Sequence, residues 1–319
     1  MMTTDLPQAW RSFSQTYEPY RADLYRYCRY LTRSPWDAED LAQDVLARAF
    51  VTLAQAARPE NPRAWLFRVA SNLWIDQLRK RREIAIDDPI TREIEPRATR
   101  EAAGTLLVKL SPQERAAVVL KDVFELSLDE IAEALGTTVG AIKTALHRGR
   151  GKLADDIAPP VETAPVPGAL DAFCTAFNAG DLDGLTALLL DHAVVEVVGA
   201  TTQYGPAAAR STVLTGLLFG TRWIASADNP LDPELTRGVL AECPRVEPRF
   251  HRGRWVLVHW YQHVDGEAVR AFTLLDFEGD RVARLQNYFY TSELIAELGA
   301  ELQLPVRING HLWSREMTR

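Results

Sequence analysis

Hydrophobic residues recur at helical spacing through the first quarter of the chain. Leu41 and Val45 follow the run Ser-Pro-Trp-Asp at 34–37, which combines a capping residue, a first-turn proline and an acid near a helix start. A second amphipathic stretch spans residues 63–82. Together these patterns predict an all-α domain over residues 12–83.

A second helical segment, residues 105–157, carries its own start and stop signals. Ser111 and Ser127 are each followed three residues later by glutamate, which is the pattern of a capping box. Gly136 then ends one helix, and Thr138 caps the next. A helix, a short glycine turn and a helix in this order predict a helix-turn-helix domain.

The periodicity changes after a proline-rich linker. Two short helices are expected near 169–178 and 182–190, strands at 255–261 and on both sides of the hairpin signal Glu278-Gly279-Asp280, and a last helix near 292–302. This mixture predicts an α+β domain after two all-α domains. The expected divisions are a helical domain at 12–83, a linker at 84–104, a helix-turn-helix domain at 105–157, a linker at 158–168, an α+β domain at 169–290, and a C-terminal helix and tail at 291–319.

Charge is distributed unevenly along this chain, whose net charge is −7. Residues 158–319 contain 13 Arg, no Lys and 20 Asp or Glu, so they carry all of the net negative charge. The neutral remainder holds two basic clusters, one at 79–82 and one at 143–152. Local basic faces of this kind bind phosphate whatever the overall charge.

Several functional classes are disfavoured by what the sequence lacks. No apolar run reaches the length of a membrane span, and no signal peptide is visible, so we expect a cytoplasmic protein without a membrane partner. The three cysteines form no CxxC pair, so neither a zinc site nor a disulfide framework is expected. We predict no metal and no cofactor.

The helix after Gly136 has the residue pattern of a DNA-reading helix. One face is apolar, and the other presents two i,i+4 pairs, formed by Lys143, Thr144, His147 and Arg148. Lysine and arginine reach guanine edges or phosphates, and threonine contacts a thymine methyl. The alternative is a solvated basic face on a structural helix.

A polar stripe on the 63–82 helix suits contacts to an unpaired strand. It consists of Asn72, Asp76, Arg79 and Lys80. Mixed amide, carboxylate and cationic groups suit an unstacked base and its flanking phosphates. Trp65 and Trp74 are further candidates for base contact, although their spacing favours a place in the core.

These segments resemble, in family order, the conserved regions of extracytoplasmic-function (ECF) sigma factors. Residues 37–44 resemble region 2.2, and 62–72 with the following Asp76 and Arg79 resemble regions 2.3 and 2.4. Region 4 is matched by the segments 110–115, 127–132 and 139–144. The resemblance covers about half of the chain.

The resemblance implies a role for each set of residues. Asp40, Gln43, Asp44 and Arg48 would face the β′ clamp of core RNA polymerase. Asn72, Asp76, Arg79 and Lys80 would help to capture the unpaired −10 strand, and Lys143, Thr144, His147 and Arg148 would read the −35 element. Polymerase, contacted also through its β flap, would supply catalysis and its metal.

The C-terminal part resembles the cone-shaped SnoaL-like domains, some of which are fused to ECF sigma factors and act on them in cis. The acidic charge, the short linker and the apolar tail predict docking onto the sigma domains, with Trp313 as the anchor. A small ligand of unknown identity is a further candidate partner.

Two rival interpretations remain open. One is a helix-turn-helix regulator that binds duplex DNA without polymerase, although the run at 37–48 is then unexplained. The other is a DNA-tethered enzyme, in which His259, Tyr261 and His263 share a strand face and Asp276 lies on a neighbouring strand. We predict no catalytic residue and no enzymatic activity.

Overall fold

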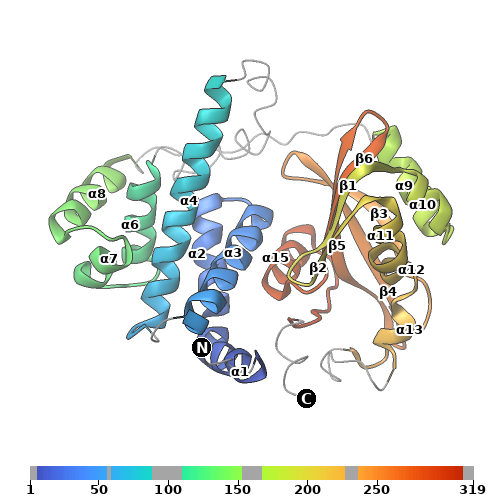
Figure 1. Ribbon diagram of the computed structural model, residues 1–319, viewed down its shortest axis with the longest axis horizontal. Helices are drawn as coiled ribbons and strands as arrows, with labels where there is room; N and C mark the ends of the chain where they lie inside the picture. The colour runs from blue at the N-terminus through green and yellow to red at the C-terminus, as the bar shows by residue number, and fades with distance from the viewer. Residues whose placement is uncertain (1–5, 56–58, 88–109, 153–166, 227–235, 312–319) are drawn as a thin grey trace. The chain divides into compact units, whose positions relative to one another are not determined.

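The computed structural model describes residues 6–55, 59–87, 110–152, 167–226 and 236–311. The chain divides into two compact units, Met1–Val161 and Glu162–Arg319. Helices make up the described part of the first unit, and helices and a sheet make up that of the second (Figure 1). No helix in the described ranges has both the length and the hydropathy of a membrane span.

The first unit opens with a group of helices that contains both predicted apolar stripes. Its elements are α1 (Leu6–Tyr17), the 3-10 turn η1 (Glu18–Tyr20), α2 (Arg21–Thr32), α3 (Pro35–Gln55) and α4 (Pro62–Asp87). The predicted start of α3 is confirmed, because the Asp37 amide donates to the Ser34 hydroxyl at 3.3 Å. Leu41 and Val45 are fully buried in the core of this group.

Three further helices form the predicted helix-turn-helix domain: α6 (Pro112–Asp122), α7 (Leu128–Ala134) and α8 (Val139–Lys152). Both capping boxes are confirmed. The hydroxyls of Ser111 and Ser127 accept from the backbone amides of Glu114 and Glu130, and the carboxylates of these glutamates accept from the backbone amides of the two serines. Gly136 has φ +60°, the left-handed conformation that lets the chain turn between α7 and α8. The helix-turn-helix prediction is therefore confirmed.

The two helical groups pack against each other through Phe124, in the turn after α6. Its ring centroid lies 5.0 Å from that of Phe67 and 6.0 Å from that of Tyr27. Arg115 adds a polar contact, because its Nη1 donates to the Leu31 carbonyl at 2.6 Å. The sequence patterns indicated two domains but not this contact between them.

The second unit is built on a six-stranded sheet with the order β2-β1-β6-β5-β4-β3. Its strands are β1 (Leu189–Val197), β2 (Thr201–Tyr204), β3 (Arg245–His251), β4 (Arg254–His263), β5 (Gly266–Glu278) and β6 (Arg281–Tyr288). β1 runs parallel to β6, and the other neighbours are antiparallel. The predicted strand at 255–261 and the hairpin at Gly279 are confirmed.

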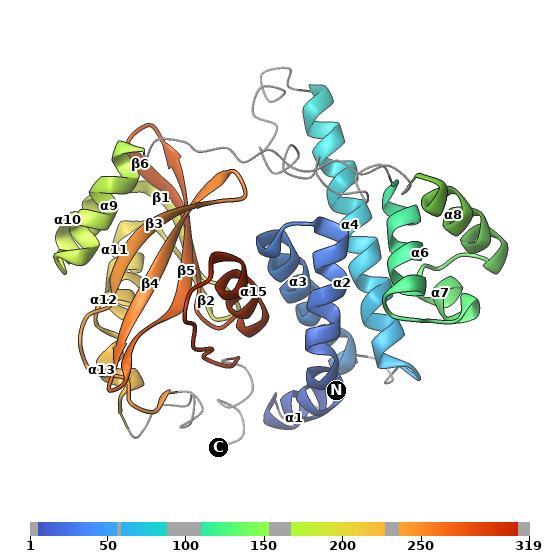
Figure 2. The ribbon, with the colours of Figure 1, turned by 180° about the vertical axis from the view of Figure 1, so that it is seen from behind.

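Helices cover both faces of this sheet (Figures 1 and 2). One face carries α9 (Gly168–Asn178), α10 (Leu182–Ala187), α11 (Gly205–Ala209), the π-helical turn η5 (Arg210–Leu214), α12 (Thr215–Phe219) and α13 (Thr221–Ile224), and the other carries α15 (Ser292–Leu302). The predicted α+β architecture is confirmed. One boundary was wrong, because residues 189–190 belong to β1 and not to the second helix.

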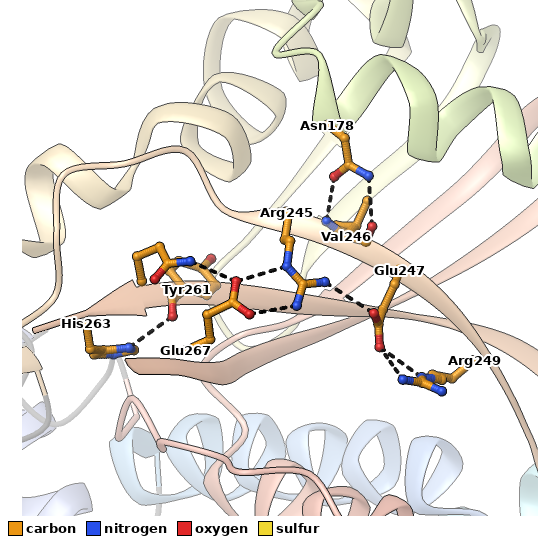
Figure 3. A network of polar contacts seen from close by, with 9 residues as sticks. Asn178, Arg245, Val246, Glu247, Arg249, Tyr261, His263 and Glu267 are labelled. Atoms are coloured by element: carbon orange, nitrogen blue, oxygen red, sulfur yellow. Dashed lines mark hydrogen bonds and ion pairs between the residues drawn. The ribbon is translucent and has the colours of Figure 1, made fainter. Parts of the chain in front are cut away.

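The edge strand β3 is fixed to its neighbours by side-chain bonds. Asn178 of α9 accepts from the Val246 amide at 2.7 Å and donates to its carbonyl at 2.9 Å. On the same strand, Arg245 pairs with Glu247 at 3.2 Å and with Glu267 of β5 at 2.8 Å (Figure 3). These bonds fix the position of the edge strand.

The residues after α15 pack back onto the sheet of their own unit. Val306 lies so close to Gly299 that a Cβ on that glycine would be 2.4 Å from its Cγ1. Asn309 is 1% exposed and donates to the carbonyls of Arg270 and Phe289 at 2.7 and 2.6 Å. The segment expected to be a tail that docks onto the sigma domains is therefore part of its own domain as far as residue 311, and Trp313 lies outside the described residues.

Candidate polymerase and promoter-binding surfaces

The predicted polymerase-binding residues lie along one side of α3. Asp44 and Arg48 are exposed, and Asp40 and Gln43 are half-buried. Gln43 donates to the Glu39 carboxylate at 2.7 Å. Glu39 itself is buried and lies 3.6 Å from the guanidinium of Arg21, so it holds α3 against α2 while its neighbours reach the surface.

The predicted −10 stripe on α4 is exposed along its whole length. Asn72, Asp76, Arg79 and Lys80 all reach solvent, and Asp76 pairs with Arg79 at 2.5 Å. Trp74 is buried, and the half-buried Trp65 packs at 5.9 Å from Tyr17. The favoured interpretation as a core residue is confirmed for Trp74, whereas Trp65 lies at the margin of the core.

A hollow of about 600 Å³ brings the α3 and α4 sets together. The residues that line it are Asp44, Ala47, Arg48, Leu73, Asp76, Gln77, Arg79 and Lys80. Sequence reasoning treated these residues as two separate sites. In the folded unit they share one surface, with acidic and basic groups side by side.

The predicted −35 helix has the expected two faces. Ile142 and Leu146 are buried at 0% and 6% exposure. Lys143, Thr144, His147 and Arg148 are all exposed. The Thr144 hydroxyl donates to the Gly140 carbonyl at 3.0 Å, which leaves its methyl group free to contact a base.

A second hollow, of about 540 Å³, adjoins the exposed face of α8. Its lining consists of Lys121, Leu128, Lys143, Leu146, His147 and Arg150. Arg150 is held by Asp122, with Nε 3.2 Å from Oδ2, and this bond raises the pKa of the guanidinium. The sequence analysis did not name Lys121 as a candidate binding residue. A lysine in the last turn of a helix, as in α6, can be recognised from the sequence.

The C-terminal unit does not assemble the acid and base set considered for catalysis. His259 is buried, lies 2.8 Å from the Thr273 hydroxyl, and has its pKa lowered by burial to about 3. Thr273 also accepts from Asn287 at 2.9 Å. Asp276 is exposed and lies 3.5 Å from Arg254. Because side chains alternate along a strand, Asp276 faces away from Thr273 and His259.

Two models of known protein families match segments of the helical unit. The model of Sigma-70 region 2 matches residues 16–84, and that of Sigma-70 region 4 matches residues 100–153. The ECF RNA polymerase sigma factor SigG of Mycobacterium tuberculosis is 30% identical over 243 residues, which is 63% of this chain and 65% of SigG. The chain thus spans slightly less than two thirds of that relative.

Two further proteins are similar to this chain. The ECF RNA polymerase sigma factor SigW of Bacillus subtilis is 32% identical over 162 residues, covering 44% of this chain and 87% of SigW. The crystal structure of the Mycobacterium tuberculosis ECF sigma factor SigJ aligns with 88% of this chain and 97% of its own, at 22% identity and a TM-score of 0.32.

The fold of the helical unit and the two matched regions define a protein of the sigma-70 class. Within that class, the chain belongs to the ECF RNA polymerase sigma factors.

Proposed function

We propose that this chain binds core RNA polymerase and directs it to promoters with −10 and −35 elements. The observation that carries the proposal is the two-sided helix α8. Its buried Ile142 and Leu146 hold it in the helix-turn-helix, while Lys143 and Arg148 stand exposed on the other face. A helix presented in this way fits the major groove of DNA.

The α3 surface is the proposed contact with the β′ clamp. Asp40, Gln43, Asp44 and Arg48 give this surface both carboxylates and a cation. Complementary charges across a protein interface favour the correct partner and speed the encounter. Duplex binding alone would not need this surface, which favours a polymerase subunit over an independent regulator. Contact of the helix-turn-helix domain with the β flap belongs to the same proposal.

The α4 stripe is the proposed contact with the unpaired −10 strand. Arg79 and Lys80 supply cations for phosphates, and Asn72 and Asp76 supply polar groups for a base. Because Asp44, Arg48 and Asp76 line one hollow with these cations, polymerase binding and strand capture would occur at adjoining points of the same domain.

The C-terminal unit is proposed to regulate the sigma domains in cis. Its division as a compact unit of its own supports a distinct module. The outward position of Asp276 supports a domain without chemistry of its own. Docking through Trp313 remains part of this proposal.

The test is run-off transcription with purified core polymerase and the full-length chain. We expect promoter-dependent transcripts from the wild type and strongly reduced transcripts from a Lys143→Ala/Arg148→Ala double variant. Arg222→Ala removes an exposed cation in the other unit and serves as the control. Promoter binding without any stimulation of polymerase would instead establish the independent-regulator alternative.

A further inference from the structure

Arg150 ends a line of polar side chains on helix α8. Lys143, His147 and Arg150 stand at i, i+4 and i+7, so they follow one another along the same face of the helix. All three side chains are exposed, and all three line the hollow of about 540 Å³ beside α8. The face that carries two of the proposed −35 residues therefore continues by one turn, to an arginine that the sequence analysis did not assign.

The guanidinium of Arg150 is held by Asp122, the last residue of α6. Nε donates to Oδ2 at 3.2 Å, and Nη2 donates to Oδ1 of the same carboxylate. Two bonds to one carboxylate fix the plane of a guanidinium as well as its position. A guanidinium has further N–H groups besides these two, and they remain for an acceptor outside the protein.

The helix that carries Arg150 is closely packed on α6. Gly149 is buried, and a Cβ on this residue would lie 2.8 Å from Cγ2 of Val118. Glycine is unfavourable within a helix, and the close approach of α8 to α6 explains its presence here. The contact between the helices and the pair with Asp122 together set where the guanidinium of Arg150 lies.

The place of Arg150 along α8 favours a phosphate over a base as its ligand. A reading helix contacts bases with residues near its N-terminus, and residues near its C-terminus reach the DNA backbone. Arg150 lies in the last turn of α8, and Lys121 lines the same hollow from α6. Cations that approach one point from two helices suit a phosphate, which offers several acceptor oxygens.

We propose that Arg150 donates to a backbone phosphate of the −35 duplex, and that Asp122 is a positioning residue that strengthens this contact despite its negative charge. The inference rests on the proposed promoter function. Repulsion between Asp122 and the phosphate is weakened by the high dielectric of the exposed site. Without Asp122, Arg150 would lose the rotational freedom of its long side chain on binding DNA, and this entropy cost is the larger of the two effects.

Fluorescence anisotropy tests the proposal with the full-length protein and a labelled duplex that the wild type has selected from a random-sequence library. Arg150→Ala should weaken binding about tenfold and lower the salt slope by about one, as expected for the loss of one phosphate contact. Asp122→Ala should weaken binding at least about threefold. Glu133→Ala removes an exposed carboxylate from α7. It is the matched control and should bind like the wild type or more tightly.

Two double variants separate positioning from a merely structural bond between α6 and α8. Asp122→Ala/Arg150→Ala should bind DNA like Arg150→Ala alone, because Asp122 acts through Arg150. The exchange Asp122→Arg/Arg150→Asp restores an ion pair between the helices, so it should unfold at the temperature of the wild type and still bind DNA weakly. An exposed ion pair contributes little to stability, so each variant should fold.

Three outcomes overturn the proposal. The first is wild-type or tighter DNA binding by Asp122→Ala, which would mean that this carboxylate only repels DNA. The second is a wild-type salt slope for Arg150→Ala. The third is recovery of DNA binding by the exchanged pair, which would leave the bond a structural role alone.

The same experiment separates this inference from the promoter function. If the wild type selects no duplex, both fail together. If it selects a duplex, and Lys143→Ala/Arg148→Ala weakens binding while the Asp122 and Arg150 variants bind like the wild type, only the inference on Asp122 and Arg150 fails.

Discussion

The ring of Phe124, in the turn after α6, packs edge-on against that of Phe67 in α4, with their centroids 5.0 Å apart. The guanidinium groups of Arg26 and Arg63 lie 5.7 and 5.5 Å from the same ring. One aromatic side chain from the helix-turn-helix domain therefore lies between aromatic and cationic groups of the preceding domain. Removal of this ring tests how strongly the two domains hold together.

We expect Phe124→Ala to lower the free energy of unfolding of the helical unit by on the order of 3 kcal/mol, because a buried aromatic contact is replaced by a cavity. Urea denaturation of the full-length protein measures the loss. Val123→Ala is the matched control, since Val123 is 42% exposed and its truncation should change stability by less than about 0.5 kcal/mol. Equal effects of the two variants would contradict the prediction.

Asp44→Arg should weaken binding to core polymerase by about tenfold or more, because it reverses a charge on the proposed contact surface. A pull-down titration with purified core polymerase gives the affinity. Glu242→Arg makes the same reversal at an exposed position of the other unit and should bind like the wild type. Unchanged affinity of Asp44→Arg would exclude α3 as the contact.

Lys143→Ala and Arg148→Ala should each weaken promoter binding, and the salt dependence separates two kinds of contact. Loss of a bidentate base contact costs about 1–3 kcal/mol, whereas loss of a phosphate contact chiefly flattens the salt slope. Fluorescence anisotropy with promoter DNA at several salt concentrations distinguishes them. Wild-type binding by both variants would show that α8 is not the reading helix.

Stability of the C-terminal unit should fall in acid because of His259. The folded state lowers the pKa of this ring to about 3, so the unfolded chain, whose histidine titrates near 6.5, takes up the proton first. The contribution of the neutral His259 ring to the free energy of unfolding is complete above about pH 6.5. It decreases by roughly 1.4 kcal/mol per pH unit as the pH falls toward 3. His263 acts in the same direction.

Urea denaturation of the C-terminal transition between pH 4 and 7 measures this slope. His259→Gln removes the titrating group at a similar size and should flatten the curve. His192→Gln, at an exposed position, should leave the slope as it is. A wild-type curve that is flat over this range would contradict the assignment.

Asn309→Ala should destabilise the C-terminal unit by about 1–3 kcal/mol, because it leaves buried groups of Arg270 and Phe289 without their partner. Thermal unfolding of the full-length variant measures the loss. Gln303→Ala, at an exposed position before this segment, is the control. Truncation of the chain after residue 304 would remove Asn309 as well. An effect of such a truncation would therefore reflect the folding of the C-terminal unit before it reflected docking onto the sigma domains.

The local signals of the sequence predicted much of this fold correctly. Ser111 and Ser127 indicated helix starts because a capping box is formed by neighbours in the chain. The two faces of α8 followed from the helical repeat, which also placed Lys143 and Arg148 on the exposed side.

The errors and omissions concern contacts between distant residues. Phe124 looked like any apolar residue, since nothing nearby in sequence indicates Phe67 as its neighbour. Asp276 does lie on the strand next to that of His259, but the sequence pattern did not give the strand register, which decides the face on which a side chain lies. Arg270 was missed as a buried residue because a bulge in β5, and not an alternating pattern, places it in the core.

The bidentate hold of Asn178 on Val246 has a consequence for self-association. An edge strand with free amides and carbonyls is a template on which another chain can add a strand. Here the side-chain amide of Asn178 occupies the donor and the acceptor of Val246, and Pro248, two residues on, has no amide to offer. Growth of the sheet past β3 is blocked at these two positions, so high cellular concentrations of the factor are not expected to give aggregates through this edge.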